Sequence, residues 1–223
     1  MEITGIIDGD FLSDKVLNLC LKRLCTQFRF KTQDVLLSTI ALDQPQTIKF
    51  RPAEGMGLQI INDGMCHWLL AFYDSGVVYL IDTFKRSPTP ELKDSLWSLY
   101  GHHFENQMTV EYLCIPRQIN NWVCGYLAVA YLVDMLNLDF RVETQYLEYG
   151  IGRRLMSFLD NNKFEKFSHT RILRHTGRSR VITIERGPHK MGRSIYDMQQ
   201  LAKHGINEEL VVKIDKHDFL KYV

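Results

Sequence analysis

The chain has 223 residues, which is enough for one domain with a solid core but short for two full domains. Its composition, 45% hydrophobic and 24% charged with a formal net charge of +1, is ordinary for a soluble protein. No stretch reaches the roughly 20 continuous apolar residues that a membrane span needs, and the N-terminus lacks a signal-peptide pattern. We therefore expect a protein of the cytoplasm or nucleus that makes no contact with a membrane.

The first half of the chain predicts a helix, a strand and then a β-hairpin. Apolar residues at helical spacing predict a helix over about 13–28, with Ser13 as its N-cap. The segment "DVLLSTIAL" (34–42) is expected to be a strand. Two β-rich runs within 67–84 flank Asp74-Ser75-Gly76, and this arrangement is a strong signal for a hairpin.

The second half continues with helices and strands in irregular order. A helix is expected after Pro88 and Pro90, followed by a strand over 108–115 and by a polar loop that leads to a helix near Cys124. No repeat and no regular βαβ alternation is visible in the chain. The sequence therefore predicts the α+β class.

Five cysteines are present, an odd number without a C-x-x-C pair, so neither a disulfide framework nor a zinc site is indicated. Cys20 and Cys25 lie on the apolar face of the first predicted helix, and Cys114 ends the apolar strand at 108–115. We interpret these three as core residues, because free cysteine is commonly buried. The other two are Cys66 and Cys124.

The C-terminal part of the chain is basic. Residues 163–193 contain nine Lys or Arg and two Glu, a local charge of +7 against −6 for the remainder. One interpretation is a solvated tail. The other is contact with nucleic acid or another polyanion, since clustered guanidinium groups gain from counterion release. A strand-like segment, "RVITIE" (180–185), lies within this region and can pack on the body.

Cys124 stands at the expected start of an apolar helix, where unpaired N–H groups and the helix dipole favour a thiolate. A cysteine nucleophile needs a base, a group that orients the base, and donors for an oxyanion. His67 opens the first hairpin strand and Asp82 closes the second, so antiparallel pairing predicts that they are neighbours. Gln118, six residues before Cys124, is the candidate oxyanion donor.

Each of these residues also has a structural interpretation. A histidine at a strand start is commonly structural, the aspartate is a turn or cap residue, and the glutamine is a surface amide. A buried cysteine is commonly a small hydrophobe. Together the four favour catalysis, but their spacing alone leaves both interpretations open.

These residues carry a resemblance to the SUMO-specific and adenain-type cysteine proteases, whose pattern is His-Trp, then Asp, then Gln-x-Asn-x-x-Asp-Cys-Gly. The matching segments are "HWLLAFYDSGVVYLIDTF" (67–84) and "QINNWVCGYLAVAYLVDML" (118–136). The opening segment 10–24 is similar to that family's N-terminal segment. The segment 149–167 resembles the closing helix and tail of compact forms carried by transposable elements and DNA viruses. The match covers roughly residues 8–168.

The resemblance implies a circularly permuted, papain-like α+β fold with a mixed central sheet flanked by helices. It also implies hydrolysis after a Gly-Gly terminus, without a cofactor or a metal. In that scheme Cys124 attacks the carbonyl, His67 moves the proton, Asp82 holds the imidazole, and Gln118 stabilises the oxyanion.

Two further positions are expected at the substrate. Trp68 matches the tryptophan that lines the channel for the substrate's glycines in relatives, with core packing as the alternative. Gly125 permits close backbone approach beside the nucleophile. The chain departs from the family at Val123, where relatives commonly have aspartate. Cys66 adjoins the base, and we expect strand alternation to make it a packed residue on the face opposite His67.

We expect a catalytic domain over 1–168 and a basic extension over 169–223. The predicted function is a cysteine peptidase or isopeptidase acting on a ubiquitin-like modifier, or on a viral or element-encoded polyprotein. For a virus-encoded protein, the host cell or the virion is the corresponding location. Two alternatives are an acetyltransferase with the same Cys/His site and a nucleic-acid-binding module with a degenerate protease body, which would bind through 163–193.

Overall fold

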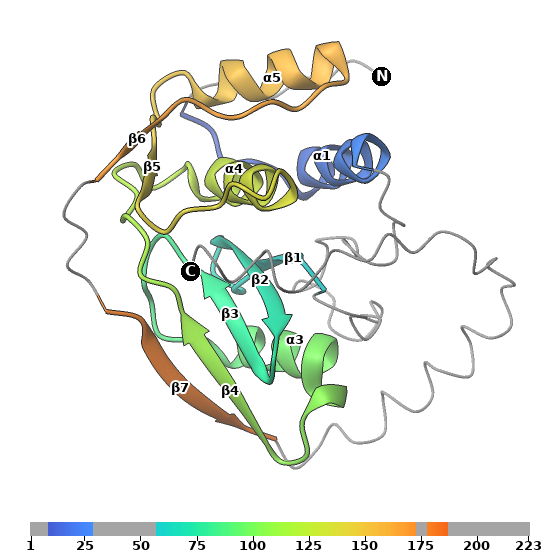
Figure 1. Cartoon of the computed structure of the whole chain (residues 1–223), viewed down its shortest axis with the longest axis vertical. Coiled ribbons are helices and arrows are strands. Elements are labelled where there is room, and N and C mark those ends of the chain that lie inside the picture. Colours follow the sequence, from blue (N-terminus) through green and yellow to red (C-terminus); the bar gives the residue numbers. More distant parts are fainter. Residues whose placement is uncertain (1–8, 29–56, 173–177, 187–223) are drawn as a thin grey trace, which may run out of the picture.

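A five-stranded mixed sheet forms the centre of the computed structural model, which describes residues 9–28, 57–172 and 178–186 (Figure 1). The strand order is β1-β2-β3-β4-β7. The strands are β1 (Gln59–Asn62), β2 (Trp68–Asp74), β3 (Val77–Ile81), β4 (Gln107–Tyr112) and β7 (Arg180–Glu185). β3 and β4 run parallel, whereas the other neighbouring strands are antiparallel. The strand predicted at 34–42 lies outside the described residues.

Helices cover both faces of this sheet (Figure 1). They are α1 (Asp14–Gln27), α3 (Pro90–Tyr100), α4 (Cys124–Leu136) and α5 (Ile151–Asn161), with a short 3-10 helix at Gly101–His103. Ser13 is the N-cap of α1, as predicted: its side chain accepts a hydrogen bond from the N–H of Val16 at 3.3 Å. α3 begins at Pro90, and Thr89 caps it by accepting from the N–H of Leu92 at 3.1 Å.

The predicted hairpin is β2–β3. Asp74 pairs with Val77, so the loop between the strands has two residues. Both loop residues, Ser75 and Gly76, have positive φ (48° and 88°), as in the turn type that matches the right-handed twist of a hairpin. This tight turn sets the register of β2 against β3 along their whole length, including the end opposite the turn.

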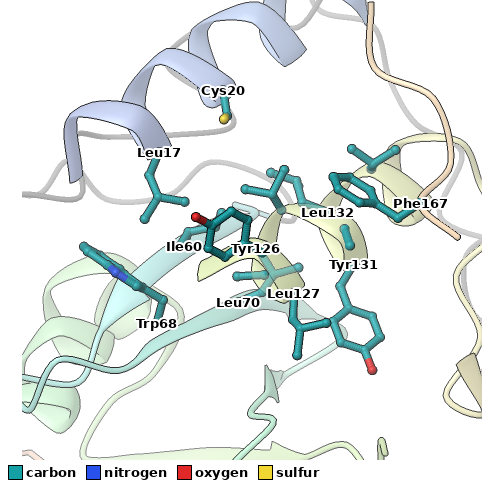
Figure 2. Close-up of a cluster of buried hydrophobic side chains, with 14 of the residues drawn as sticks. Leu17, Cys20, Ile60, Trp68, Leu70, Tyr126, Leu127, Tyr131, Leu132 and Phe167 are labelled. Carbon is teal, nitrogen blue, oxygen red and sulfur yellow. The ribbon is translucent and has the colours of Figure 1, made fainter. Parts of the chain in front are cut away.

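The two faces of the sheet contact separate apolar cores, because successive side chains of a strand point to opposite sides. Leu70 and Phe72 of β2 face the core made with α1, α4 and α5, whereas Leu69 and Ala71 face α3. Figure 2 shows the first of these cores around α4. Every residue of α4 is buried, so this helix is fixed between the sheet and the outer helices.

The basic region after residue 168 contributes strands to the body. β6 (His169–Arg171) pairs with β5 (Thr144–Tyr146), and β7 pairs with β4 at the edge of the main sheet. The domain boundary at 168 stays a prediction, but these described parts of the extension pair with strands that precede it.

The mixed sheet with helices on both faces confirms the α+β class. In the described ranges, none of the helices has the length and apolar run required to cross a membrane.

Candidate active site

His67 and Asp82 lie at the same end of the β2–β3 hairpin. His67 directly precedes β2 and Asp82 directly follows β3, and the register pairs Leu70 with Ile81. The Nε2 atom of His67 is 2.8 Å from Oδ1 of Asp82. Both side chains are buried, at 2% and 3% exposure. The hairpin therefore brings together two residues that are fifteen positions apart.

Asp82 is held as an oriented carboxylate. The backbone N–H of Phe84 donates to Oδ1 at 2.8 Å, and that of Arg86 donates to Oδ2 at 2.9 Å. Burial alone would raise the pKa of Asp82, but the hydrogen bond and charge of His67, together with the two backbone donors, lower it below its usual value. The turn after β3 thus provides a fixed negative charge beside the imidazole.

The backbone of His67 is fixed by Asp63. The N–H of His67 donates to Oδ1 of Asp63 at 3.1 Å, and the N–H of Asp63 donates to the carbonyl of His67 at 2.9 Å. The Phe84 ring packs against the imidazole, with 4.7 Å between the ring centroids. No sequence pattern singles out Asp63, although Asn62-Asp63-Gly64 is a turn-forming run before the strand.

Cys124 is the first residue of α4, where its side chain is near enough to the His67 ring to raise the pKa of the imidazole. Since Nε2 of His67 is hydrogen-bonded to Asp82, the nitrogen left for the thiol is Nδ1, which is buried and has no hydrogen-bond partner among the described residues. Burial opposes protonation of His67, but hydrogen bonds and charges from Asp82 and Cys124 outweigh it and raise the pKa of His67 to about 9. The arrangement favours the protonated form of the His67 ring.

Val123 occupies the N-cap of α4 and makes no side-chain capping bond. An aspartate there would compete for the N–H groups of the first helical turn. These N–H groups have no acceptor within the helix, because an α-helix leaves its first donors unpaired. The departure from the resembled pattern therefore leaves the helix start adjoining Cys124 without a carboxylate cap.

Gln118 is hydrogen-bonded to Thr83, the residue that follows Asp82. Its N–H donates to the carbonyl of Thr83 at 3.2 Å, and the Thr83 hydroxyl donates to its Oε1. Its Nε2 donates to the carbonyl of Asn120 at 2.5 Å. A primary amide has two N–H donors, so one of them is left for a ligand. The role of Gln118 as an oxyanion donor stays a prediction.

Trp68 and Gly125 pack against each other beside the nucleophile. The indole N–H of Trp68 donates to the carbonyl of Leu12 at 3.1 Å, and the side chain is buried in the core shown in Figure 2. A Cβ at Gly125 would lie 2.8 Å from Cβ of Leu12 and 3.2 Å from Cδ1 of Trp68. Core packing thus explains the described contacts of Trp68, while its role at the substrate stays a prediction.

The burial of the remaining four cysteines agrees only in part with the prediction. Cys20 and Cys25 are buried as predicted, and burial raises the pKa of Cys20 to about 12. Cys114 is only half-buried, with Nζ of Lys85 3.9 Å from its sulfur. The expectation for Cys66 was wrong, because β2 begins only at Trp68. Cys66 lies in the preceding turn with φ of 62° and is exposed.

Arginines of the basic region contact the body where the structure describes them. Arg180 donates to the carbonyl of Arg86 at 2.5 Å and lies over the Tyr112 ring. Arg186 donates to the carbonyl of Glu105 at 3.3 Å. Nucleic-acid binding by this region stays a prediction.

Among the described residues, no group of three or more His, Cys, Asp or Glu side chains is arranged to hold a metal ion.

Comparison with solved structures finds similarity to the SUMO protease Ulp1 with its catalytic cysteine oxidised to a sulfenic acid. That match has a TM-score of 0.49 and 15% identity over 71% of this chain and 82% of the other. A structure titled as the de-sumoylating protease matches with a TM-score of 0.37 and 11% identity, over 70% of this chain and 76% of the other. No protein-family model and no curated protein matches the sequence. Any functional inference must therefore come from the side chains themselves.

Proposed function

We propose that this chain is a cysteine peptidase or isopeptidase whose nucleophile is Cys124. The observation that carries the proposal is the position of the His67 ring, which is hydrogen-bonded through Nε2 to Asp82 while the neighbouring Cys124 helps to raise its pKa. This order of thiol, imidazole and carboxylate supplies the nucleophile, the proton carrier and the orienting group that acyl transfer requires. All three groups are buried, His67 and Asp82 next to the ends of paired strands and Cys124 at the start of α4, and these elements hold the geometry of the site.

The reaction follows from the charges of these groups. The thiol of Cys124 passes its proton to His67, its sulfur attacks the carbonyl carbon of the scissile bond, and the carbonyl oxygen becomes an oxyanion. The free N–H of Gln118 and the donors at the start of α4 stabilise this oxyanion. The imidazolium of His67 then donates its proton to the leaving amine, which gives a thioester. Water, deprotonated by His67, hydrolyses the thioester and regenerates the thiol.

We assign the substrate class as a polypeptide ending in Gly-Gly at the cleaved bond. Candidates are precursors or conjugates of a ubiquitin-like modifier, or a polyprotein. The joint His-Trp, Asp and Gln-x-Asn-x-x-x-Cys-Gly order in the sequence supports this assignment.

The test is covalent labelling with an electrophilic probe that ends in Gly-Gly. Cys124→Ala is expected to abolish labelling. Cys66→Ala is a matched control, because it removes an exposed thiol two residues from Trp68, and it should leave labelling intact. Loss of labelling in the control but not in Cys124→Ala would refute the assignment.

Substrate identity is tested separately with ubiquitin conjugates, SUMO conjugates and plain Gly-Gly peptides, with and without DNA. Hydrolysis that depends on Cys124 supports a peptidase. Acetyl transfer from acetyl-CoA without proteolysis would replace it with the acetyltransferase alternative. Tight, salt-sensitive nucleic-acid binding without probe labelling would favour the binding-module alternative.

A further inference from the structure

The loop that carries Gln118 is held by a carboxylate from a distant part of the chain. Oε1 of Glu148 accepts from the N–H of Ile119 at 2.6 Å. Oε2 of Glu148 accepts from both the N–H and the side-chain Nδ2 of Asn120, at 2.8 and 2.7 Å. We infer that Glu148 is a positioning residue that sets the oxyanion-binding amide of Gln118, an inference that rests on the proposed peptidase function.

The hydrogen bonds to Glu148 hold the backbone of the loop at residue 119. The Ile119 side chain is 78% exposed, so apolar packing does not anchor this position. Glu148 in contrast is 8% exposed and presents both oxygens to donors of the loop. Hydrogen bonds to an ionised carboxylate are about twice as strong as neutral ones, so the three together define the path of the backbone.

The link from Glu148 to Gln118 passes through the peptide groups of Asn120. The N–H of Asn120 donates to Glu148, while its carbonyl accepts from Nε2 of Gln118 at 2.5 Å. On the other side, Oε1 of Gln118 accepts from the Thr83 hydroxyl. The amide is thus fixed at its oxygen by Thr83 and at its nitrogen by Asn120. A shift of Asn120 rotates the amide and re-aims the remaining N–H.

Glu148 itself sits on a fixed support between β5 and α5. Its carbonyl accepts from the N–H of Ile151 at 3.3 Å, which closes the turn into α5. Gly150 has φ of 76°, a conformation that L side chains rarely adopt. The N–H of Leu147, the preceding residue, donates to the carbonyl of Ser168 at 2.9 Å. The carboxylate therefore couples the loop to the α5 side of the fold.

The test exploits a difference between two reactions of Cys124. Alkylation by iodoacetamide needs the thiolate but forms no oxyanion, whereas hydrolysis of a fluorogenic Gly-Gly peptide amide forms one. The background is Cys66→Ala, and the label is read at Cys124 by peptide mass spectrometry. We expect Glu148→Gln to lower kcat by about 10- to 100-fold, part of the loss typical of an oxyanion donor, with little change in KM. The alkylation rate should remain that of the parent.

Two comparisons separate a loss of Gln118 positioning from a general loss of structure. Gln118→Ala should lower kcat more strongly than Glu148→Gln, and adding Glu148→Gln to it should have little further effect, because the group being positioned is gone. Glu165→Gln is the matched control, since the side chain of Glu165 is half-exposed and its described partners are Lys163 and Arg154. It should preserve kcat.

If Glu148→Gln does not fold, Asn120→Ala serves instead, because it removes only the side-chain bond to Oε2. It should lower kcat by a smaller factor, about 3- to 10-fold, again without slowing alkylation. An unchanged kcat in the folded variant, equal loss of kcat and alkylation, or additive effects with Gln118→Ala would overturn the inference. Absence of Cys124-dependent hydrolysis in the parent would refute the proposed function instead.

Discussion

Nε2 of His67 and Oδ1 of Asp82 are 2.8 Å apart, although a full hairpin separates them in the sequence. Burial disfavours the charged imidazole, but Asp82 and Cys124 reverse that effect and raise the pKa of His67 from 6.5 to about 9. In the proposed reaction the imidazolium protonates the leaving amine. We therefore expect kcat/KM for a Gly-Gly peptide amide to fall as pH rises through about 9, measured as a pH profile.

Stability should follow the same titration. A histidine whose pKa is higher in the folded state than in the unfolded state stabilises the fold fully below about 6.5. This contribution is lost as pH rises through about 9. Urea unfolding at a series of pH values measures it. The Cys66→Ala protein is a useful control, because its profile should follow that of the parent.

Asp82→Asn should separate the carboxylate's charge from its shape. Without that charge and hydrogen bond the pKa of His67 falls, so the basic limb of the pH profile moves toward lower pH. We also expect kcat to fall by about 10²- to 10⁴-fold, the range for general acid–base catalysis. A basic limb that stays near pH 9 in this variant would contradict the assigned role of Asp82.

Gly125→Ala tests the packing of the nucleophile's helix. In an unconstrained helix this change would stabilise by about 0.5–1 kcal/mol. Here the new Cβ would meet Cβ of Leu12 at 2.8 Å, a group near the backbone that cannot swing away. We expect destabilisation by about 1–3 kcal/mol in urea unfolding, together with slower labelling of Cys124 because α4 starts at that residue. A gain in stability would show that the site is less tightly packed than described.

The sequence was sufficient to predict those features that local pattern determines. The turn residues around Ser75-Gly76 and the β-rich runs on either side specify a hairpin, and antiparallel geometry then places His67 beside Asp82. The helix at Cys124 was predictable from its long apolar run, which fits a helix buried on all sides.

Other features depend on contacts that no local pattern encodes. The Glu148 carboxylate reaches residues 119 and 120 only because the fold places the segment before α5 next to the loop. Cys66 was assigned to a strand, but Asp63 accepts from the N–H groups of Met65 and His67 and so forms a turn that delays the strand. Side chains that cap a turn in this way compete with strand pairing.

Tyr146→Phe should reveal a buried carboxylate on α4. The Tyr146 hydroxyl donates to Oδ2 of Asp134 at 2.6 Å, and the buried Oδ1 of Asp134 has no hydrogen-bond partner in the described part of the chain. Burial raises the pKa of Asp134, and the bond from Tyr146 counteracts part of that rise. We expect a loss of about 1–3 kcal/mol at neutral pH, measured by urea unfolding.

The loss from Tyr146→Phe should shrink at acidic pH. An acid with a raised pKa in the folded state costs stability as pH rises through that pKa, and protonation removes the cost. Tyr131→Phe is a comparison, because its hydroxyl donates to a neutral carbonyl, that of Thr144, at 3.2 Å. A loss from Tyr146→Phe that did not depend on pH would argue that Asp134 is already protonated at neutral pH.

Arg180→Ala and Arg186→Ala form a matched pair at opposite ends of β7. Arg180 donates to the carbonyl of Arg86, whose own N–H holds Oδ2 of Asp82, whereas Arg186 donates to the carbonyl of Glu105, away from the site. Loss of one such hydrogen bond corresponds to about 0.5–1.5 kcal/mol. Both variants should lose similar stability, but only Arg180→Ala should lower kcat/KM, by about two- to ten-fold. Equal activity of the two variants would mean that β7 does not support the Asp82 turn.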